Sequence, residues 1–253
     1  MNAQSAASKL VFATLISSVV FTLVACNKQP QSTNLATSPV AAIPSKPAPT
    51  ADDWKRALES TYVAKSVKDN GDGVESFMAC FGPTPQDSKK KCDVLAFGTR
   101  DAFRKLRIYE TGIPMMIGDG VSAYVSIKDN GSPVLFLGPY IFRDSWLFMS
   151  KVAIMVDGDV ILDQNLDVKS ADREVFPGGI QEHTDFIVNN DQIEALRRMK
   201  SDSKVVVRIT GTKGYMTLSK NDTAAVKNKI IEVIRVYDLI QGAVKDVIPP
   251  SGT

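Results

Sequence analysis

The chain has 253 residues, with 30 Lys and Arg against 28 Asp and Glu, so its formal net charge is only +2. That balance excludes the long-range positive field with which proteins collect nucleic acid, and it excludes charge as the means of holding an anionic membrane. A chain of this length can fold as one domain or two small ones around a substantial hydrophobic core.

The N-terminus has the layout of a secretory signal. Lys9 is its only charged side chain, an apolar run extends from Leu10 to Val24, and Cys26 follows two residues later. The run is shorter than the ~20 residues that a membrane-spanning helix needs, which disfavours a transmembrane anchor. The four residues Leu23-Val24-Ala25-Cys26 resemble the lipobox of bacterial lipoproteins.

That resemblance implies how the chain is processed and where it resides. Residues 1–25 would be removed as a signal peptide, and Cys26, acylated on its sulfur and on its new amino group, would become the first residue. A plain signal peptide is the alternative. Asn27 follows the cysteine, and inner-membrane retention goes with Asp at that position in enteric-type bacteria. We therefore expect the acyl anchor to hold the protein in the outer membrane, on its periplasmic face.

Residues 26–50 differ in composition from the apolar run before them. From Asn27 to Thr50 the chain contains five prolines among Ser, Thr, Ala, Gln and Asn, with no aromatic and no acidic residue. Such a segment cannot bury enough apolar surface to fold, so it predicts a disordered tether that spans roughly 25 to 30 Å when flexible.

The signal contains one lysine and no acid, so the mature chain carries 29 basic against 28 acidic side chains.

The three cysteines divide between two roles. If Cys26 carries lipid, Cys80 and Cys92 remain as a pair in a compartment that oxidises thiols, which predicts a disulfide bond. A zinc site is disfavoured because His183 is the only histidine and no second cysteine pair completes four ligands. We expect neither a metal nor a cofactor.

An amphipathic helix is predicted to open the folded domain. Thr50 is placed to cap it, and Trp54, Leu58 and Tyr62 recur every four residues, which predicts a helix over Ala51–Ser66. The sequence Asp69-Asn70-Gly71-Asp72-Gly73 then indicates a turn; it lacks the closing glutamate of a calcium loop.

Alternation of apolar and polar residues predicts a sheet built from hairpins. The expected strands lie over residues 76–81, 92–97, 121–127, 134–142, 146–156, 160–162, 173–176, 182–188, 204–210 and 215–218. Asp157-Gly158 has the composition of a two-residue type I′ turn. In the 146–156 run, Trp146, Phe148, Val152, Ile154 and Val156 share one parity and are expected to face the core. Thr99–Glu110 fits either a helix or a strand.

Two further helices are predicted in the C-terminal half. The first begins behind a cap at Asn189 or Asn190 and runs through Lys200. The second is capped by Ser219, with Asp222 three residues further on, and runs to Gln241, after which Gly242 ends the helix. The expected fold is therefore α+β: one domain over residues 51–242, an antiparallel hairpin-built sheet covered by amphipathic helices, followed by a flexible tail over 243–253.

Motifs that carry chemistry are weak in this chain. Gly118–Ala123 matches a loose dinucleotide-binding pattern, but the β-like residues 124–127 follow where a helix is required. Ser201–Lys204 has the Ser-x-x-Lys spacing of penicillin-binding enzymes. In those enzymes the serine stands at the start of a helix, whereas here the four residues follow the end of a predicted helix. A Ser-His-Asp triad could form only through His183, which is more simply a surface or strand-end imidazole.

These observations favour a non-enzymatic lipoprotein that binds an envelope protein or another envelope component. A protective lipoprotein that blocks a toxin, phage or hydrolase is the alternative, and a periplasmic hydrolase is disfavoured because no catalytic set stands out. The contact candidates are Lys89, Lys90 and Lys91 on an exposed loop, and Arg208, the one charge inside an apolar strand. Three lysines on a loop more often form a solvated surface.

Overall fold

A computed structural model describes residues 47–82, 92–112 and 118–249. The expected signal peptide, Cys26, most of the tether and the Lys89–Lys91 loop lie outside these residues. None of the described helices combines the length and the hydrophobicity that a membrane span requires.

Strand is the commonest secondary structure of the described chain, and the strands form two antiparallel sheets. Sheet A contains β1 (Tyr62–Asp69), β2 (Val74–Phe81), β3 (Val94–Asp101), β4 (Leu106–Thr111), β5 (Gly120–Lys128), β6 (Pro133–Arg143), β10 (Gly179–His183) and β9 (Asp172–Phe176) in spatial order, and β11 (Phe186–Ile187) also pairs with β6. Sheet B has the order β13 (Gly214–Thr217), β12 (Val205–Gly211), β7 (Met149–Val156), β8 (Asp159–Asn165). Strands β1 to β6 follow one another as hairpins, which confirms an antiparallel, hairpin-built sheet.

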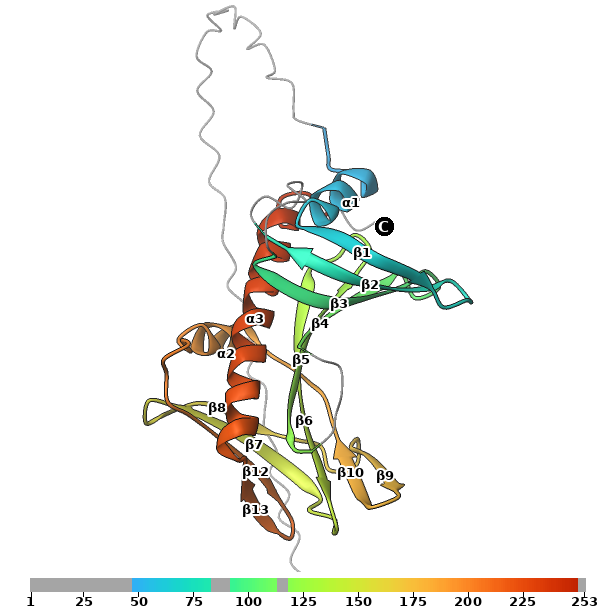
Figure 1. Cartoon of the computed structure of the whole chain (residues 1–253). Helices are drawn as coiled ribbons and strands as arrows, with labels where there is room; N and C mark the ends of the chain where they lie inside the picture. Colours follow the sequence, from blue (N-terminus) through green and yellow to red (C-terminus); the bar gives the residue numbers. More distant parts are fainter. Residues whose placement is uncertain (1–46, 83–91, 113–117, 250–253) are drawn as a thin grey trace, which may run out of the picture. The chain divides into compact units, whose positions relative to one another are not determined.

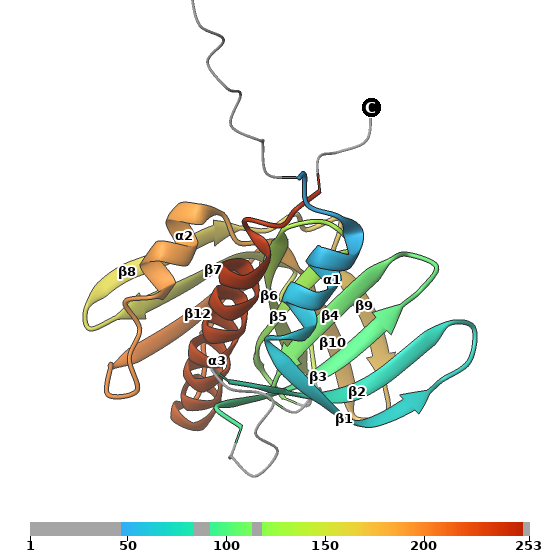
Figure 2. The same cartoon turned by 90° about the horizontal axis from the view of Figure 1, so that it is seen from above.

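Three helices complete the domain: α1 (Ala51–Glu59), α2 (Asn190–Leu196) and α3 (Lys220–Val244). The long helix α3 lies between the sheets and contacts both β5 and β12 (Figures 1 and 2). Apolar residues from α3, from both sheets and from α1 form a single buried cluster. The fold is thus α+β in class but mainly β, and the described residues belong to one compact unit that begins at Lys46.

The helix N-termini follow the capping residues expected from the sequence. Thr50 caps α1, and its side chain and that of Asp53 accept each other's backbone N–H groups in a capping box. Asn189 forms the same arrangement with Gln192 at α2, and the Ser219 hydroxyl accepts the Asp222 N–H at α3. Each cap satisfies backbone donors that a helix start leaves unpaired.

The first helix is shorter than expected. Trp54 and Leu58 are buried on α1, but the helix stops at Glu59 and Tyr62 begins β1. The Thr61 hydroxyl donates to the Leu58 carbonyl, and Tyr62 then pairs with Phe81 of β2. The expected helix to Ser66 was wrong because tertiary pairing of an aromatic and β-branched segment outweighs a four-residue spacing that fits either structure.

The later helices also end away from their expected positions. In α2 the regular helix ends at Leu196 and tightens into short turns over Arg198 and Met199 instead of continuing to Lys200. In α3 the helix passes through Gly242 to Val244, which is fully buried. Burial of that valine side chain, worth about 1.5 to 3 kcal/mol, outweighs the ~1 kcal/mol that glycine costs inside a helix. Val247 and Ile248 still pack against the core.

The strand predictions are confirmed where both the turn residues and the alternation of apolar side chains indicated a hairpin. Asp157 and Gly158 both have positive φ (52° and 100°), as a type I′ hairpin requires. Thr99–Glu110 is strand, turn and strand rather than helix. The strand predicted over residues 146–156 was wrong at its start: β7 begins at Met149, and Trp146 and Phe148 are only half-buried. Phe148 has a φ of 53°, which interrupts the alternation before the strand begins.

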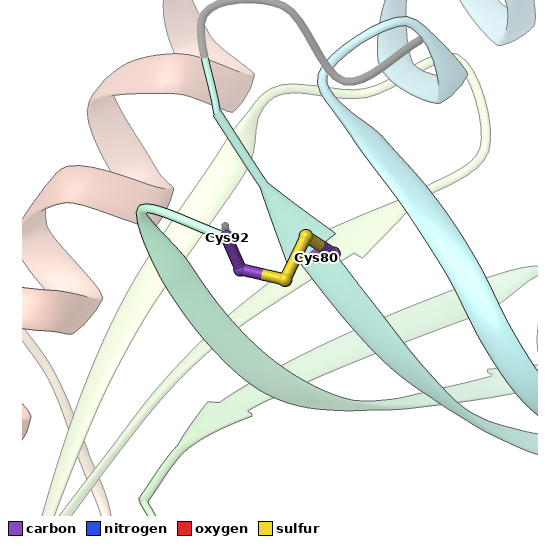
Figure 3. The surroundings of a disulfide bond; sticks show 2 residues. All are labelled: Cys80 and Cys92. Atoms are coloured by element: carbon purple, nitrogen blue, oxygen red, sulfur yellow. A yellow bond between two sulfur atoms is a disulfide. The ribbon is translucent and has the colours of Figure 1, made fainter. Parts of the chain in front are cut away.

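The predicted disulfide is present. Cys80 at the end of β2 and Cys92 just before β3 are bonded, with their Cα atoms 5.1 Å apart (Figure 3). The bond closes the base of the connection between two paired strands, since Phe81 pairs with Val94 immediately beside it. A crosslink at this position restricts the unfolded chain.

Candidate functional site

Sheet A has two faces with different surroundings. The inner face meets α3: the Thr111 hydroxyl donates to the Lys229 carbonyl at 3.0 Å, and Val121, Ala123 and Val125 on β5 are buried on this side. Residues of the opposite parity point to the outer face, because side chains alternate along a strand. On β5 that outer set includes Ser122 and Tyr124.

One row of paired residues crosses the outer face over six strands. Successive register pairs join Met78, Phe97, Glu110, Tyr124, Phe136 and Ile187, which we call the outer row. The rings of Tyr124 and Phe136 are stacked, with their centroids 5.0 Å apart. Ile187 is 61% exposed, and Leu95, also on this face, is 46% exposed. The row therefore presents apolar and aromatic surface around a single carboxylate.

Two members of the outer row, Glu110 and Tyr124, form a group of titratable side chains with His183 and Asp185, which we call the polar cluster. The Tyr124 hydroxyl donates to Asp185 Oδ2 at 2.9 Å, and Asp185 Oδ1 lies 3.0 Å from His183 Nε2. The cluster needs a residue without a side chain at Gly138, because a Cβ there would lie 2.0 Å from Asp185 Oδ1 and 2.9 Å from His183 Nε2. Gly138 thus lets the two side chains lie directly on the sheet.

Burial and neighbouring charges set the titration of the cluster. Burial raises the pKa of Glu110, and Asp185 adds to this while Lys229 opposes it. Burial by itself would lower the pKa of His183, but the hydrogen bond and charge of Asp185 raise it above its usual value overall. Burial, followed by the Asp185 charge, raises the pKa of Tyr124. Both shifts favour the protonated form, which is neutral for Glu110 and cationic for His183.

A pocket of about 450 Å³ lies next to the cluster, between α3 and the start of β5. Its lining includes Tyr140, Lys229 and Glu232, and the Lys229 ammonium is 6.0 Å from the centre of the Tyr140 ring. Lys229 also passes close to Gly112, where a Cβ would lie 2.8 Å from its Cε. Lys229 thus lines the pocket and is near enough to the polar cluster for its charge to lower the pKa of Glu110 against the effect of burial.

Of the contact and triad candidates that the structure describes, His183, which ends β10, lies in this cluster, and Arg208 does not. Arg208 is exposed on β12, with its guanidinium carbon 4.8 Å from the centre of the Tyr215 ring. Within the described ranges, no group of three or more His, Cys, Asp and Glu side chains is arranged to hold a metal ion.

Sequence reasoning missed Glu182, which is fully buried on the inner face of β10. Its Oε1 accepts the N–H groups of Leu147 (2.5 Å) and Phe148 (2.9 Å), and its Oε2 accepts that of Met149 (3.0 Å). Arg173 lies 3.5 Å from Oε2. These N–H groups belong to the connection from β6 to β7 and to the first residue of β7, so Glu182 fixes the place where the chain passes from sheet A to sheet B.

Comparison with known proteins gives no relative: no family model, no curated protein and no solved structure matches this chain.

Proposed function

We propose that this protein is a lipid-anchored envelope lipoprotein that binds a partner protein on the outer face of sheet A and does not catalyse a reaction. The observation that carries the proposal is the outer row, an apolar and aromatic surface across six adjacent strands with exposed residues at Leu95 and Ile187. Aromatic residues and methionine are enriched in protein interfaces, and exposed apolar patches mark them.

The same proposal assigns the helices to the other side of the sheet. Val226, Ile230 and Val233 of α3 are buried in the common core, which supports a role for α3 in covering the inner face. The outer face is then left for a partner. Cys26 and the tether over 26–50 would hold the domain near the outer membrane while letting that face reach another envelope protein.

The polar cluster supports a partner that offers a hydrogen-bonding or cationic group among apolar side chains. Glu110 and Asp185 are acceptors at the centre of the surface, and charged pairs inside an interface give it orientation and specificity. The cluster side chains also bond to one another: His183 Nε2 and the Tyr124 hydroxyl share Asp185. Asp185 is therefore held in place by two side chains, which suits an acceptor in a binding surface.

Substitution on the outer face tests the proposal. The compact unit from Lys46 onward, immobilised and exposed to detergent-solubilised envelopes, should retain a partner that a Leu95→Asp, Ile187→Asp double variant loses. Tyr215→Asp on β13 is the matched control, because Tyr215 is 68% exposed on sheet B. Equal capture by both variants would place the contact elsewhere.

The non-catalytic part has its own test. The same unit is incubated with peptidoglycan and with generic ester, peptide and phosphate substrates, beside a His183→Ala variant and a Glu110→Gln variant. We expect no turnover above the buffer blank. Turnover that either substitution removes would identify the polar cluster as an active site.

A further inference from the structure

A second pocket lies on the side of α3 that faces away from Tyr140. It has a volume of about 460 Å³ and is lined by the start of β12, the end of β13 and the first turns of α3. Lys220, Ala224 and Lys227 line it from α3, whereas Asp222, Lys229 and Glu232 line the pocket beside the polar cluster. Residues three, four and seven apart share one side of a helix, so α3 presents different side chains to the two pockets.

The charged side chains that line this second pocket are all positive. Its lining includes Lys204, Lys220 and Lys227 and contains no acidic residue. Among the ion pairs of the described residues, none involves these three lysines. An acid nearby, Asp157, accepts the backbone N–H of Lys204 at 2.7 Å. The charge of Lys227 also acts on Asp157, but the pocket lining itself keeps a net positive charge that attracts an anion.

One of the lysines is held in position. The Lys227 ammonium donates to the carbonyl of Ser201 at 2.5 Å and to that of Ser203 at 3.3 Å. An ammonium has three donors, so the third is free for a bound anion. Thr223 is buried in the wall of the same pocket, and the first turn of α3 adds the favourable end of the helix dipole.

The rest of the wall is apolar. Val205, Val206 and Leu218 line the pocket beside the lysines. A small inorganic anion would leave these side chains without a partner, whereas a ligand with both a charged and an apolar portion would use the whole surface.

We propose that this pocket binds a phosphate group, carried either by a lipid headgroup or by a soluble phosphate. Lysine is a common phosphate ligand because its compact charge approaches phosphate oxygens from many directions. The inference is independent of the proposed binding surface on sheet A, because the two places lie on different sheets.

The test is a titration of the compact unit from Lys46 followed by amide NMR. The probes are inorganic phosphate, monomeric dihexanoylphosphatidylglycerol, and dihexanoylphosphatidylcholine, whose net charge is zero. We expect phosphate and phosphatidylglycerol to shift the amide signals of Val205, Leu218 and Ala224. Tighter binding of phosphatidylglycerol would identify a lipid headgroup as the source, and equal binding would identify soluble phosphate.

Lys204→Gln and Lys220→Gln should each weaken the affinity about fivefold. Both side chains are exposed, so the melting temperature should not change. Lys128→Gln, an exposed lysine of β5 in sheet A, is the matched control and should leave the affinity unchanged. Phosphatidylcholine binding as tightly as phosphatidylglycerol, no shift at the pocket with any probe, or an equal effect of all three substitutions would overturn the inference.

Discussion

Glu182→Gln should destabilise the folded domain by about 3 to 5 kcal/mol, the range measured when one partner of a buried charged pair is removed. The carboxylate accepts three backbone N–H groups and faces Arg173 at 3.5 Å. Hydrogen bonds to a charged group contribute about 1.5 to 3 kcal/mol each, against about 1 for neutral ones. An amide has one acceptor oxygen, so its NH₂ group would also face a buried N–H donor.

Such a loss is large compared with the whole stability of a domain, typically 5 to 15 kcal/mol. It should be measured by urea unfolding of the compact unit from Lys46, followed by tryptophan fluorescence, because Trp54 is buried in the core. Glu174→Gln is the matched control: Glu174 lies on the neighbouring strand β9 and is exposed, so its replacement should change stability by less than about 0.5 kcal/mol. If Glu182→Gln also costs less than about 1 kcal/mol, the carboxylate does not fix the junction between the sheets.

Three further results are expected. Reduction of the Cys80–Cys92 bond should lower the free energy of unfolding by about 3 kcal/mol, the chain-entropy value for a loop of this order, and two titratable thiols in the air-oxidised native protein would contradict the bond. Cys26→Ser should abolish lipid labelling and leave the precursor uncut, whereas normal labelling would exclude the lipoprotein assignment. Asp185→Asn should lower the pKa of His183 in an NMR titration, because Asp185 raises that pKa against the effect of burial; an unchanged pKa would show that the pair is not formed.

The last of these has a consequence for stability. A histidine whose folded pKa exceeds its unfolded value stabilises the fold fully below the unfolded pKa, and that contribution is lost as pH rises through the folded pKa. The wild-type protein should therefore lose more stability than Asp185→Asn when the pH rises from about 6 to above the folded pKa of His183.

Local signals in the sequence were sufficient for much of the fold. Thr50, Asn189 and Ser219 mark helix starts because a short polar side chain is the group that accepts an unpaired backbone N–H there. Asp157-Gly158 marks a hairpin because both positions require positive φ. These features depend on a few adjacent residues, so one sequence is enough to identify them.

Features that depend on distant residues could not be predicted. The candidate site requires β4, β5, β6 and β10 to be neighbours, and no local pattern states that His183 will lie beside Tyr140. Alternation does place Ser122 and Tyr124 on the opposite face from Val121 and Ala123, but it does not identify which face a helix will contact. Glu182 resembled an ordinary strand residue, because the backbone N–H groups that its carboxylate accepts lie 33 to 35 positions away.

The binding surface on sheet A can be tested most directly by photo-crosslinking in living cells. A photoreactive phenylalanine analogue is placed in the full chain at Ile187 on the outer face or at Tyr215 on sheet B, both of which are exposed. The proposed function predicts a discrete adduct from position 187, lost when Leu95→Asp is added, and none from position 215. An adduct from position 215 alone, or none from position 187, would contradict it.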